Sequence, residues 1–334
     1  MNVLAFGEVM MRLAAPNYKL LDQTDALEMT FSGTGLNMMS SLARSGVKTQ
    51  LFTILPENAV GRAARSFVRR LGVSDERVLM SECEPHIGSY FLEMGYGNRP
   101  SEVTYLDRRH SAFCQTKLAD ETMRDALKDI NLLHICGIAL LTSEQSRENA
   151  LNLARMAHEA GITICFDFNY RRSLAKGVSH EILVESYKKM LGFSDIVFGS
   201  ARDLLSLLGI QHADDESQER LYQRFMEAYQ VKYFGGTQKT TEGNQKFLQG
   251  FLVFQGRIIY SRKREIFSFD RIGTGDAFAA GILLGLIEKW EMQETLEFAS
   301  VNAQLAYTTY GDSPVLSREF IQAKMADENA DIIR

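Results

Sequence analysis

Short apolar runs and stretches with helical spacing alternate through much of this chain. The apolar runs predict buried strands, at 130–136, 162–168 and 195–199. The helical spacing predicts a helix at 57–72, before these strands, and helices between and after them at 142–161, 180–191, 201–208 and 217–230. Such alternation is typical of an α/β fold, a mostly parallel sheet with helices on both faces.

Local signals mark the ends of two of these helices. Thr142 and Gln145 have the spacing of a capping box at a helix N-terminus. Gly161 suits the cap at the other end of that helix, because glycine readily adopts the left-handed conformation. Gly72 closes the earlier helix in the same way.

The alternation breaks at two places. After a strand at 3–9 the chain enters no helix until about residue 36, and 87–106 predicts a hairpin with "YGNRPS" as its turn. Strands in these two segments, which leave the main sheet, can pair with each other and form a second, small sheet. We therefore expect one domain, 1–334, in which about 10–35 and 87–112 form a small β lid that excludes water from a cleft.

Composition narrows the function without defining it. The chain has 334 residues, 24% of them charged, and a formal net charge of -5. A mildly acidic protein has no general attraction to nucleic acid or to an anionic membrane, so any acidic ligand must be held by local cations. The four cysteines lack C-x-x-C spacing and predict reduced, buried thiols, while the N-terminus lacks a signal peptide, so we expect a cytoplasmic protein.

The stretch "IGTGDAFAAG" carries the clearest chemical signal. It follows the strand-like "REIFSFD" and precedes an apolar helix, so its glycines lie at a helix N-terminus that can bind an anion. It is neither a Walker A loop nor a dinucleotide-binding fingerprint. Asp276 in the first turn would repel a phosphate unless it takes a proton from an attacking hydroxyl. The alternative is that Asp276 only caps the helix.

"GTGDAFAAG" resembles the signature of the ribokinase-like, phosphofructokinase-B family of sugar kinases, and the likeness extends over nearly the whole chain. The segments "GSYFLEMGYGNRPSEVTY", "DFNYRRSL" and "YGD" are similar to the 2-keto-3-deoxygluconate kinase branch. The resemblance implies ATP, Mg²⁺ and a β lid, with Asp276 as base and the amides of Gly273, Thr274, Gly275 and Asp276 as anion hole. It also implies substrate contacts at Gly33, Asn37, Tyr90, Tyr105, Arg108, Arg171 and Asp312.

Arg108 and Arg171 favour an acidic sugar, since two convergent arginines suit a carboxylate and a neutral sugar needs no such pair. Arg172 lies beside Arg171, and we expect only one of the two to face the cleft. Each arginine could instead be a solvated surface charge or the partner of a nearby acidic residue. For the tyrosines the alternative is packing, the commoner role of a lone aromatic residue on a strand. For Asn37 it is helix capping, and for Asp312 it is helix capping or a plain turn.

The family's N-x-x-E signature, which organises Mg²⁺ and phosphates, reads "SARD" here, so the resemblance assigns Ser200 to ATP and Asp203 to the metal. Gly235, Gly236 and Thr237 are assigned to ATP phosphates, or to an ordinary hairpin. Asn302 is assigned to the adenine, or is a polar residue that faces a neighbouring helix. Further departures are Ser32 in place of a glycine, Gly35 near the position of a branch glutamate, Ala175 in place of a tryptophan, and an inserted Leu106.

These observations predict an ATP-dependent kinase of a small sugar acid, which converts 2-keto-3-deoxygluconate to its 6-phosphate. The alternatives are a kinase of fructose, ribose, a nucleoside or 5-keto-2-deoxygluconate, and a non-catalytic sugar-acid-binding or regulatory protein. An exposed lid edge could pair between two subunits, which would give a homodimer.

Overall fold

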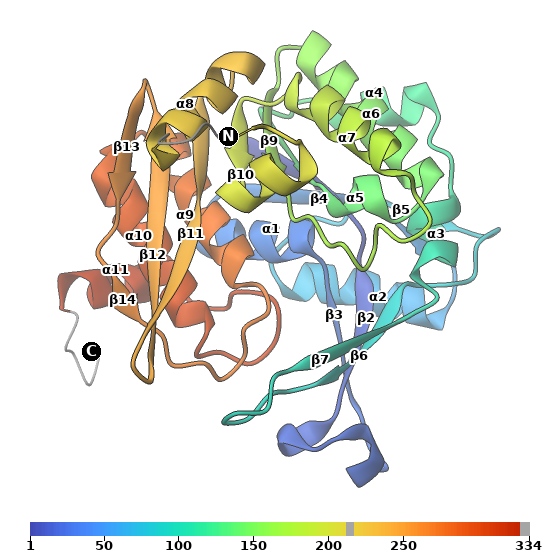
Figure 1. The fold of residues 1–334 in the computed structure, drawn as a ribbon. Helices are drawn as coiled ribbons and strands as arrows, with labels where there is room; N and C mark the ends of the chain where they lie inside the picture. The colour runs from blue at the N-terminus through green and yellow to red at the C-terminus, as the bar shows by residue number, and fades with distance from the viewer. Residues whose placement is uncertain (212–216, 328–334) are drawn as a thin grey trace.

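The main sheet has ten strands and is mostly parallel (Figure 1). The computed structural model describes residues 1–211 and 217–327. Strands β11, β10, β9, β8, β1, β4 and β5 are neighbours in this order and run parallel, while β12, β13 and β14 extend the β11 edge with antiparallel pairing. The bounds are β1 Asn2–Phe6, β4 Lys48–Pro56, β5 Val78–Ser81, β8 Leu132–Cys136, β9 Thr163–Asp167, β10 Ile196–Phe198, β11 Tyr233–Glu242, β12 Gln245–Phe254, β13 Arg257–Tyr260 and β14 Arg264–Glu265.

Strand β1 shows why the parallel strands are continuous apolar runs. Leu4 and Phe6 enter the core on one face of the sheet, and Val3 and Ala5 enter the core on the other. All four side chains are fully buried, because helices cover both faces and leave no solvated side for polar residues.

The helices divide between these two cores. One face packs against α3 Ala112–Gln115, α4 Asp120–Leu127, α5 Ile138–Leu141, α6 Glu144–Glu159, α7 His180–Leu191 and α8 Gln218–Tyr229. The other packs against α1 Thr34–Arg44, α2 Ala59–Arg70, α9 Thr274–Glu288, α10 Met292–Ala306 and α11 Arg318–Ala326. The expected α/β class is confirmed. The predicted helix at 201–208 is present over 201–207, but its Asp203–Leu207 part is a π-helix.

A separate four-stranded sheet projects from the body below α2, and we call it the lid (Figure 1). Its order is β3-β2-β6-β7, with β2 parallel to β6 and the other pairs antiparallel. The strands lie within the two segments expected for it, as β2 Met10–Ala14, β3 Glu28–Ser32, β6 Ser89–Glu93 and β7 Glu102–Leu106. Apolar side chains on one face of the lid contact Ile272 of the body.

The predicted capping box of α6 is wrong by one residue. Ser143 is the cap, since its hydroxyl accepts from the Ser146 amide at 2.9 Å and its own amide donates to Ser146 Oγ at 3.2 Å. Thr142 cannot take this place, because its backbone is helical and ends the preceding turn α5. Gly161 does adopt the expected left-handed conformation, with φ 70°.

Two other local predictions need correction. Only Arg264–Glu265 of "REIFSFD" forms a strand, because the chain then turns away and the amides of Phe269 and Asp270 donate to the carbonyl of Tyr307. The thiols are free as expected, but Cys83 is exposed while the other three are buried. Among the described residues, no helix combines the length and apolar character needed to cross a bilayer.

Helices α9 and α10 approach so closely that Gly281 has no room for a side chain. A Cβ there would lie 2.5 Å from Ala299 Cα. We expect Gly281→Ala to lower the free energy of unfolding by about 1–3 kcal/mol, as overpacking does. Denaturant unfolding measures this, with Gly192→Ala as the matched control, because Gly192 has φ -64° and its Cβ would meet nothing closer than 3.4 Å. Equal stability of the two variants would contradict the prediction.

Candidate active site

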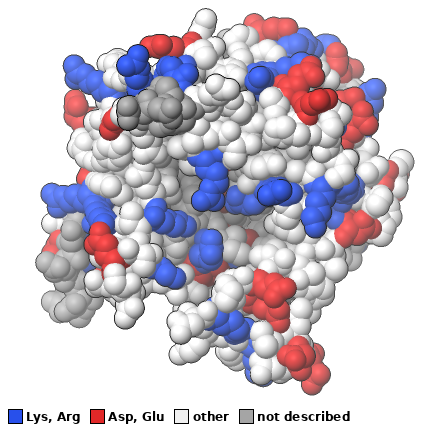
Figure 2. Space-filling view, viewed as in Figure 1, with Lys and Arg blue, Asp and Glu red and all other residues white. Residues whose placement is uncertain are grey.

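A cleft of about 710 Å³ lies between the lid and the carboxyl ends of β1, β9 and β10, where open α/β sheets bind ligands. Figure 2 shows it as a hollow in the middle of this face of the molecule. The cleft brings together most of the predicted site residues: Gly33, Asn37, Tyr90, Tyr105, Arg108, Arg171, Ser200, Asp203, Thr237, Gly273, Thr274, Gly275, Asp276 and Asp312.

The glycine turn at the start of α9 opens into this cleft. Gly273 has φ 80°, a conformation that favours glycine, and a Cβ at this position would clash with the carbonyl oxygen of Asp312. A Cβ at Gly275 would meet nothing within 4 Å, so the first turn of α9 faces open space. An anion can therefore approach the unpaired N–H groups of this helix end without displacing protein atoms.

Asp276 is the carboxylate of this helix end, and it is only 5% exposed. The side-chain amide of Asn37 donates to Asp276 Oδ2 at 2.7 Å, and Ser313 Oγ donates to Asn37 Oδ1 at 2.9 Å. Burial raises the pKa of Asp276 well above its ordinary value, the Asn37 hydrogen bond opposes this rise, and the Asp167 charge adds to it. The result is a carboxylate with a fixed orientation and a greater affinity for a proton than an exposed aspartate has.

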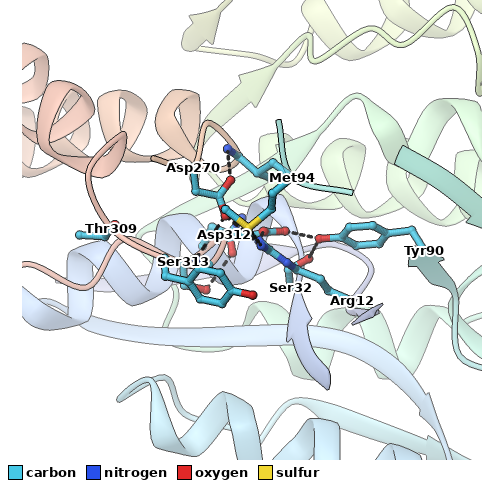
Figure 3. A network of polar contacts seen from close by, with 12 residues as sticks. Arg12, Ser32, Tyr90, Met94, Asp270, Thr309, Asp312 and Ser313 are labelled. Atoms are coloured by element: carbon cyan, nitrogen blue, oxygen red, sulfur yellow. Dashed lines mark hydrogen bonds and ion pairs between the residues drawn. The ribbon is translucent and has the colours of Figure 1, made fainter. Parts of the chain in front are cut away.

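Asp312 lies in the cleft with both carboxylate oxygens engaged. Oδ1 accepts from the Arg12 guanidinium and Oδ2 accepts from the Tyr90 hydroxyl, which also contacts Ser32 Oγ at 3.1 Å (Figure 3). Burial and the Asp312 charge raise the pKa of Tyr90. Asp312 does not cap the last helix, because Ser317 caps α11.

Arg108 faces the cleft from the end of the lid hairpin, and Glu8 holds it there. Arg108 Nε donates to Glu8 Oε2 at 2.6 Å, and Ser111 Oγ donates to Glu8 Oε1 at 2.9 Å. The guanidinium lies over the Tyr105 ring at 5.4 Å. Tyr105 and Arg108 therefore both reach the cleft despite the inserted Leu106, which pairs with Ser89 at the end of β7.

Arg171 is the second predicted arginine, and it lines the cleft while Arg172 is not among the lining residues. Burial raises the pKa of both Asp167 and Asp276, and the Arg171 charge opposes this rise, so its guanidinium acts on the carboxylates of the site. Arg202, Lys239 and Arg271 also line the cleft, and Lys and Arg gather around the hollow in Figure 2. This acidic protein thus presents local cations where an acidic ligand would bind.

Ser200 and Asp203 face the cleft after β10, and they also contact each other. Asp203 Oδ2 accepts from the Ser200 amide at 2.9 Å and from its hydroxyl at 2.7 Å. The other carboxylate oxygen of Asp203 has no role in this pair. In the part of the chain that the structure describes, no group of three or more His, Cys, Asp or Glu side chains could hold a metal ion.

Three residues assigned to ATP by resemblance, Gly235, Gly236 and Asn302, lie outside the cleft lining. Asn302 is 2% exposed, and its amide donates to Ser41 Oγ at 3.1 Å and to the Ala277 carbonyl at 2.8 Å, so it joins α10 to α1 and α9. A Cβ at Gly236 would clash with the carbonyl oxygen of Gly199, so close packing of the backbone accounts for a glycine at this position. Gly235 likewise packs within β11, and Thr237 is the member of this set that lines the cleft.

The sequence reasoning missed Glu8, Arg12 and Asp167. Glu8 follows β1 and Asp167 ends β9, so the rule that ligands bind beyond the carboxyl ends of strands could have identified both. Arg12 carried a weaker signal, as a cation in the middle of an apolar strand of the lid. Its partners, Asp270 and Asp312, lie far along the chain and no local pattern indicates them.

Comparison with known proteins identifies the class of protein that carries this site. Residues 1–318 match the pfkB family of carbohydrate kinases. The chain belongs to this family and is an ATP-dependent sugar kinase.

Individual relatives match all or most of the chain. It is 42% identical to a candidate 2-keto-3-deoxygluconate kinase from Enterococcus faecalis, with a TM-score of 0.96 over 100% of this chain and 99% of that one. A 2-dehydro-3-deoxygluconokinase from Thermotoga maritima is 29% identical, with a TM-score of 0.90 over 98% of each chain. A 2-dehydro-3-deoxygalactonokinase from Haloferax volcanii is 28% identical over 100% of this chain and 99% of its own length. Further relatives, 22% to 26% identical, are 5-dehydro-2-deoxygluconokinases.

The charge state of Asp167 gives this site a pH dependence. Burial raises the pKa of Asp167 from 3.8 to about 7, and the Asp203 charge adds to the rise. At a pH between these two values the folded protein keeps a proton on Asp167 that the unfolded chain has lost. The contribution of this carboxyl to the free energy of unfolding therefore falls as pH rises from about 4 to 7.

We therefore expect Asp167→Asn to stabilise the ligand-free protein by an amount that grows by roughly 2 kcal/mol from pH 5 to pH 8. Asparagine can still accept the Asn169 amide hydrogen, which lies 3.0 Å from Asp167 Oδ1. Thermal unfolding at pH 5 and pH 8 measures the difference. A constant difference between wild type and variant would contradict the raised pKa.

Proposed function

We propose that this kinase phosphorylates a sugar acid, and that its substrate is 2-keto-3-deoxygluconate, converted to the 6-phosphate with ATP as donor. The observation that carries the proposal is the buried Asp276 in the first turn of α9, beside the open space at Gly275. A carboxylate in this position serves to remove a proton from an acceptor hydroxyl while amides beside it hold the transferring phosphoryl group.

Each bond change then has a group that promotes it. Asp276 takes the proton as the sugar oxygen bonds to the γ-phosphorus, and the bond to the β-phosphate oxygen breaks to release ADP. The amides of Gly273, Thr274, Gly275 and Asp276 stabilise charge on the phosphoryl oxygens. The lid supports transfer to sugar in preference to water, because it covers the cleft that contains the base.

The chain's carboxylates fit Mg²⁺ carried by ATP. Asp203 and Asp167 both line the cleft. Burial raises the pKa of Asp167 and the Asp203 charge adds to the rise, so the two carboxylates lie near enough to interact. Mg²⁺ is usually held by one or two carboxylates together with waters and phosphates, so a cage of protein ligands is not required. Asp203 and Asp167 would hold the ion, which neutralises phosphate charge when bound. Ser200, Thr237, Arg202 and Lys239 would contact the nucleotide.

The sugar acid is supported by Arg108 and Arg171, which line one cleft and suit a carboxylate. The names of the Enterococcus, Thermotoga and Haloferax relatives also describe kinases of keto-deoxy sugar acids. Gly33, Asn37, Tyr90, Tyr105 and Asp312 complete the sugar side of the cleft. The second candidate substrate is 5-keto-2-deoxygluconate, because more distant relatives bear that name. Pairing of two lids into a homodimer stays a prediction.

The first test is turnover against a panel of keto-deoxy sugar acids and neutral sugars, with ATP and Mg²⁺ present. We expect Asp276→Asn to lower kcat about 100- to 10,000-fold, the range that general base catalysis contributes. Coupled ADP release measures turnover, and calorimetry measures sugar binding, which we expect to change little. A variant that keeps most of its turnover would show that Asp276 is not the base. Sugar binding without turnover in the wild type would favour the non-catalytic alternative.

A second variant tests whether Arg171 binds a carboxylate of the substrate. We expect Arg171→Ala to lower kcat/KM for the sugar acid about 10-fold or more, the value of one charged hydrogen bond, with a much smaller effect on any neutral sugar that is accepted. Arg172→Ala is the matched control, because Arg172 is exposed beside Arg171 and is not among the lining residues. Equal losses for acidic and neutral sugars would remove the argument for a carboxylate.

A further inference from the structure

Arg12 joins the lid to two loops of the body. It lies on β2, its side chain is 0% exposed, and its Nη2 lies 2.9 Å from Asp270 Oδ2 while Nη1 contacts Asp312 Oδ1. Figure 3 shows the guanidinium between these two carboxylates, with Tyr90 of the lid on the far side of Asp312. Burial alone would lower the pKa of Arg12, but the Asp312 and Asp270 charges raise it, so the guanidinium stays charged.

The two carboxylates fix the loops on either side of the anion hole. Asp270 Oδ1 accepts from the Ile272 amide at 3.2 Å, and Oδ2 accepts from the Gly311 amide at 3.3 Å. One aspartate thus joins the turn before α9 to the loop before α11. The backbone of Gly273 then packs directly against the carbonyl of Asp312.

The same loop reaches the proposed base. Ser313 follows Asp312 and donates to Asn37 at 2.9 Å, and Asn37 donates to Asp276 at 2.7 Å. A shift of the 311–313 loop would therefore move both the Gly273 turn and the hydrogen bond that orients Asp276. Arg12 lies at the start of this chain of contacts, although it is not among the residues that line the cleft.

We propose that Arg12 is a positioning residue for phosphoryl transfer: from the lid it sets the relative placement of the 270–273 turn and the 311–313 loop. The inference rests on the proposed function, in which these segments shape the anion hole and orient Asp276. A guanidinium suits this role because its planar fork donates to two carboxylates at once, and a lysine ammonium lacks that geometry. Catalytic groups that move by about 1 Å can lose on the order of 100-fold in rate.

The alternative is that Arg12 only stabilises the fold, since removing one partner of a buried ion pair is costly. The test variant is therefore Arg12→Lys, which keeps the charge and loses the fork. The matched control is Arg264→Lys, because Arg264 is also a buried arginine, its Nη2 lies 2.7 Å from Glu297 Oε2, and it is not among the lining residues of the cleft. The Tm of both variants is measured first, and kinetics are run well below the lower Tm.

We expect Arg12→Lys to lower kcat about 10- to 100-fold with the sugar KM changed less than about 3-fold, whereas Arg264→Lys keeps kcat within about 2-fold of wild type. A purely structural role would give both variants equal kcat at equal loss of Tm, and that result would overturn the proposal. Unchanged kcat in Arg12→Lys would overturn it as well.

Amide hydrogen exchange of the ligand-free protein separates this inference from the proposed function, because it needs no turnover. We expect faster exchange in Arg12→Lys over 269–277 and 307–313, including the Ile272 and Gly311 amides that donate to Asp270. Exchange unchanged from wild type in these segments would overturn the positioning role. Wild-type protein without turnover on any sugar would instead overturn the proposed function, and the exchange result would still decide whether Arg12 fixes the loops.

Discussion

The site depends on one close approach of two backbones. The turn before α9 and the loop before α11 meet at Gly273 and Asp312, where a side chain on Gly273 would clash with the Asp312 carbonyl. This contact fixes where α9 begins and which way its unpaired amides face. The adjoining residues extend its effect, since Asp312 reaches the lid through Arg12 and Tyr90, and Ser313 reaches Asp276 through Asn37.

The electrostatics of the cleft differ from those of the chain as a whole. The net charge is -5, but Arg108, Arg171, Arg202, Lys239 and Arg271 line the cleft. Burial raises the pKa of Asp167 and of Asp276, so nearby cations strongly affect whether these two carboxyl groups are charged. ATP and a sugar acid are both anionic, so a cleft of this kind can attract them while the remaining surface keeps an acidic balance.

Buried polar contacts give several residues a structural role beside their predicted function. Asn37 and Asp312 were predicted to contact substrate, and each also holds a neighbouring segment in place. Asn302 only joins helices, which was the alternative weighed for it. Buried amides and carboxylates need partners in the protein, so one side chain of this kind commonly both supports the backbone and faces the ligand.

The sequence by itself determined the α/β class, the two segments of the lid and the glycine turn with Asp276, because strand and helix periodicity and turn residues are local properties. It also placed Arg108 and Arg171 after strands that end at the cleft. Tertiary structure alone decided that Gly236 and Asn302 lie off the cleft, and that Arg12 pairs with Asp270 and Asp312. Those outcomes depend on contacts between residues up to 300 positions apart, for which no local pattern exists.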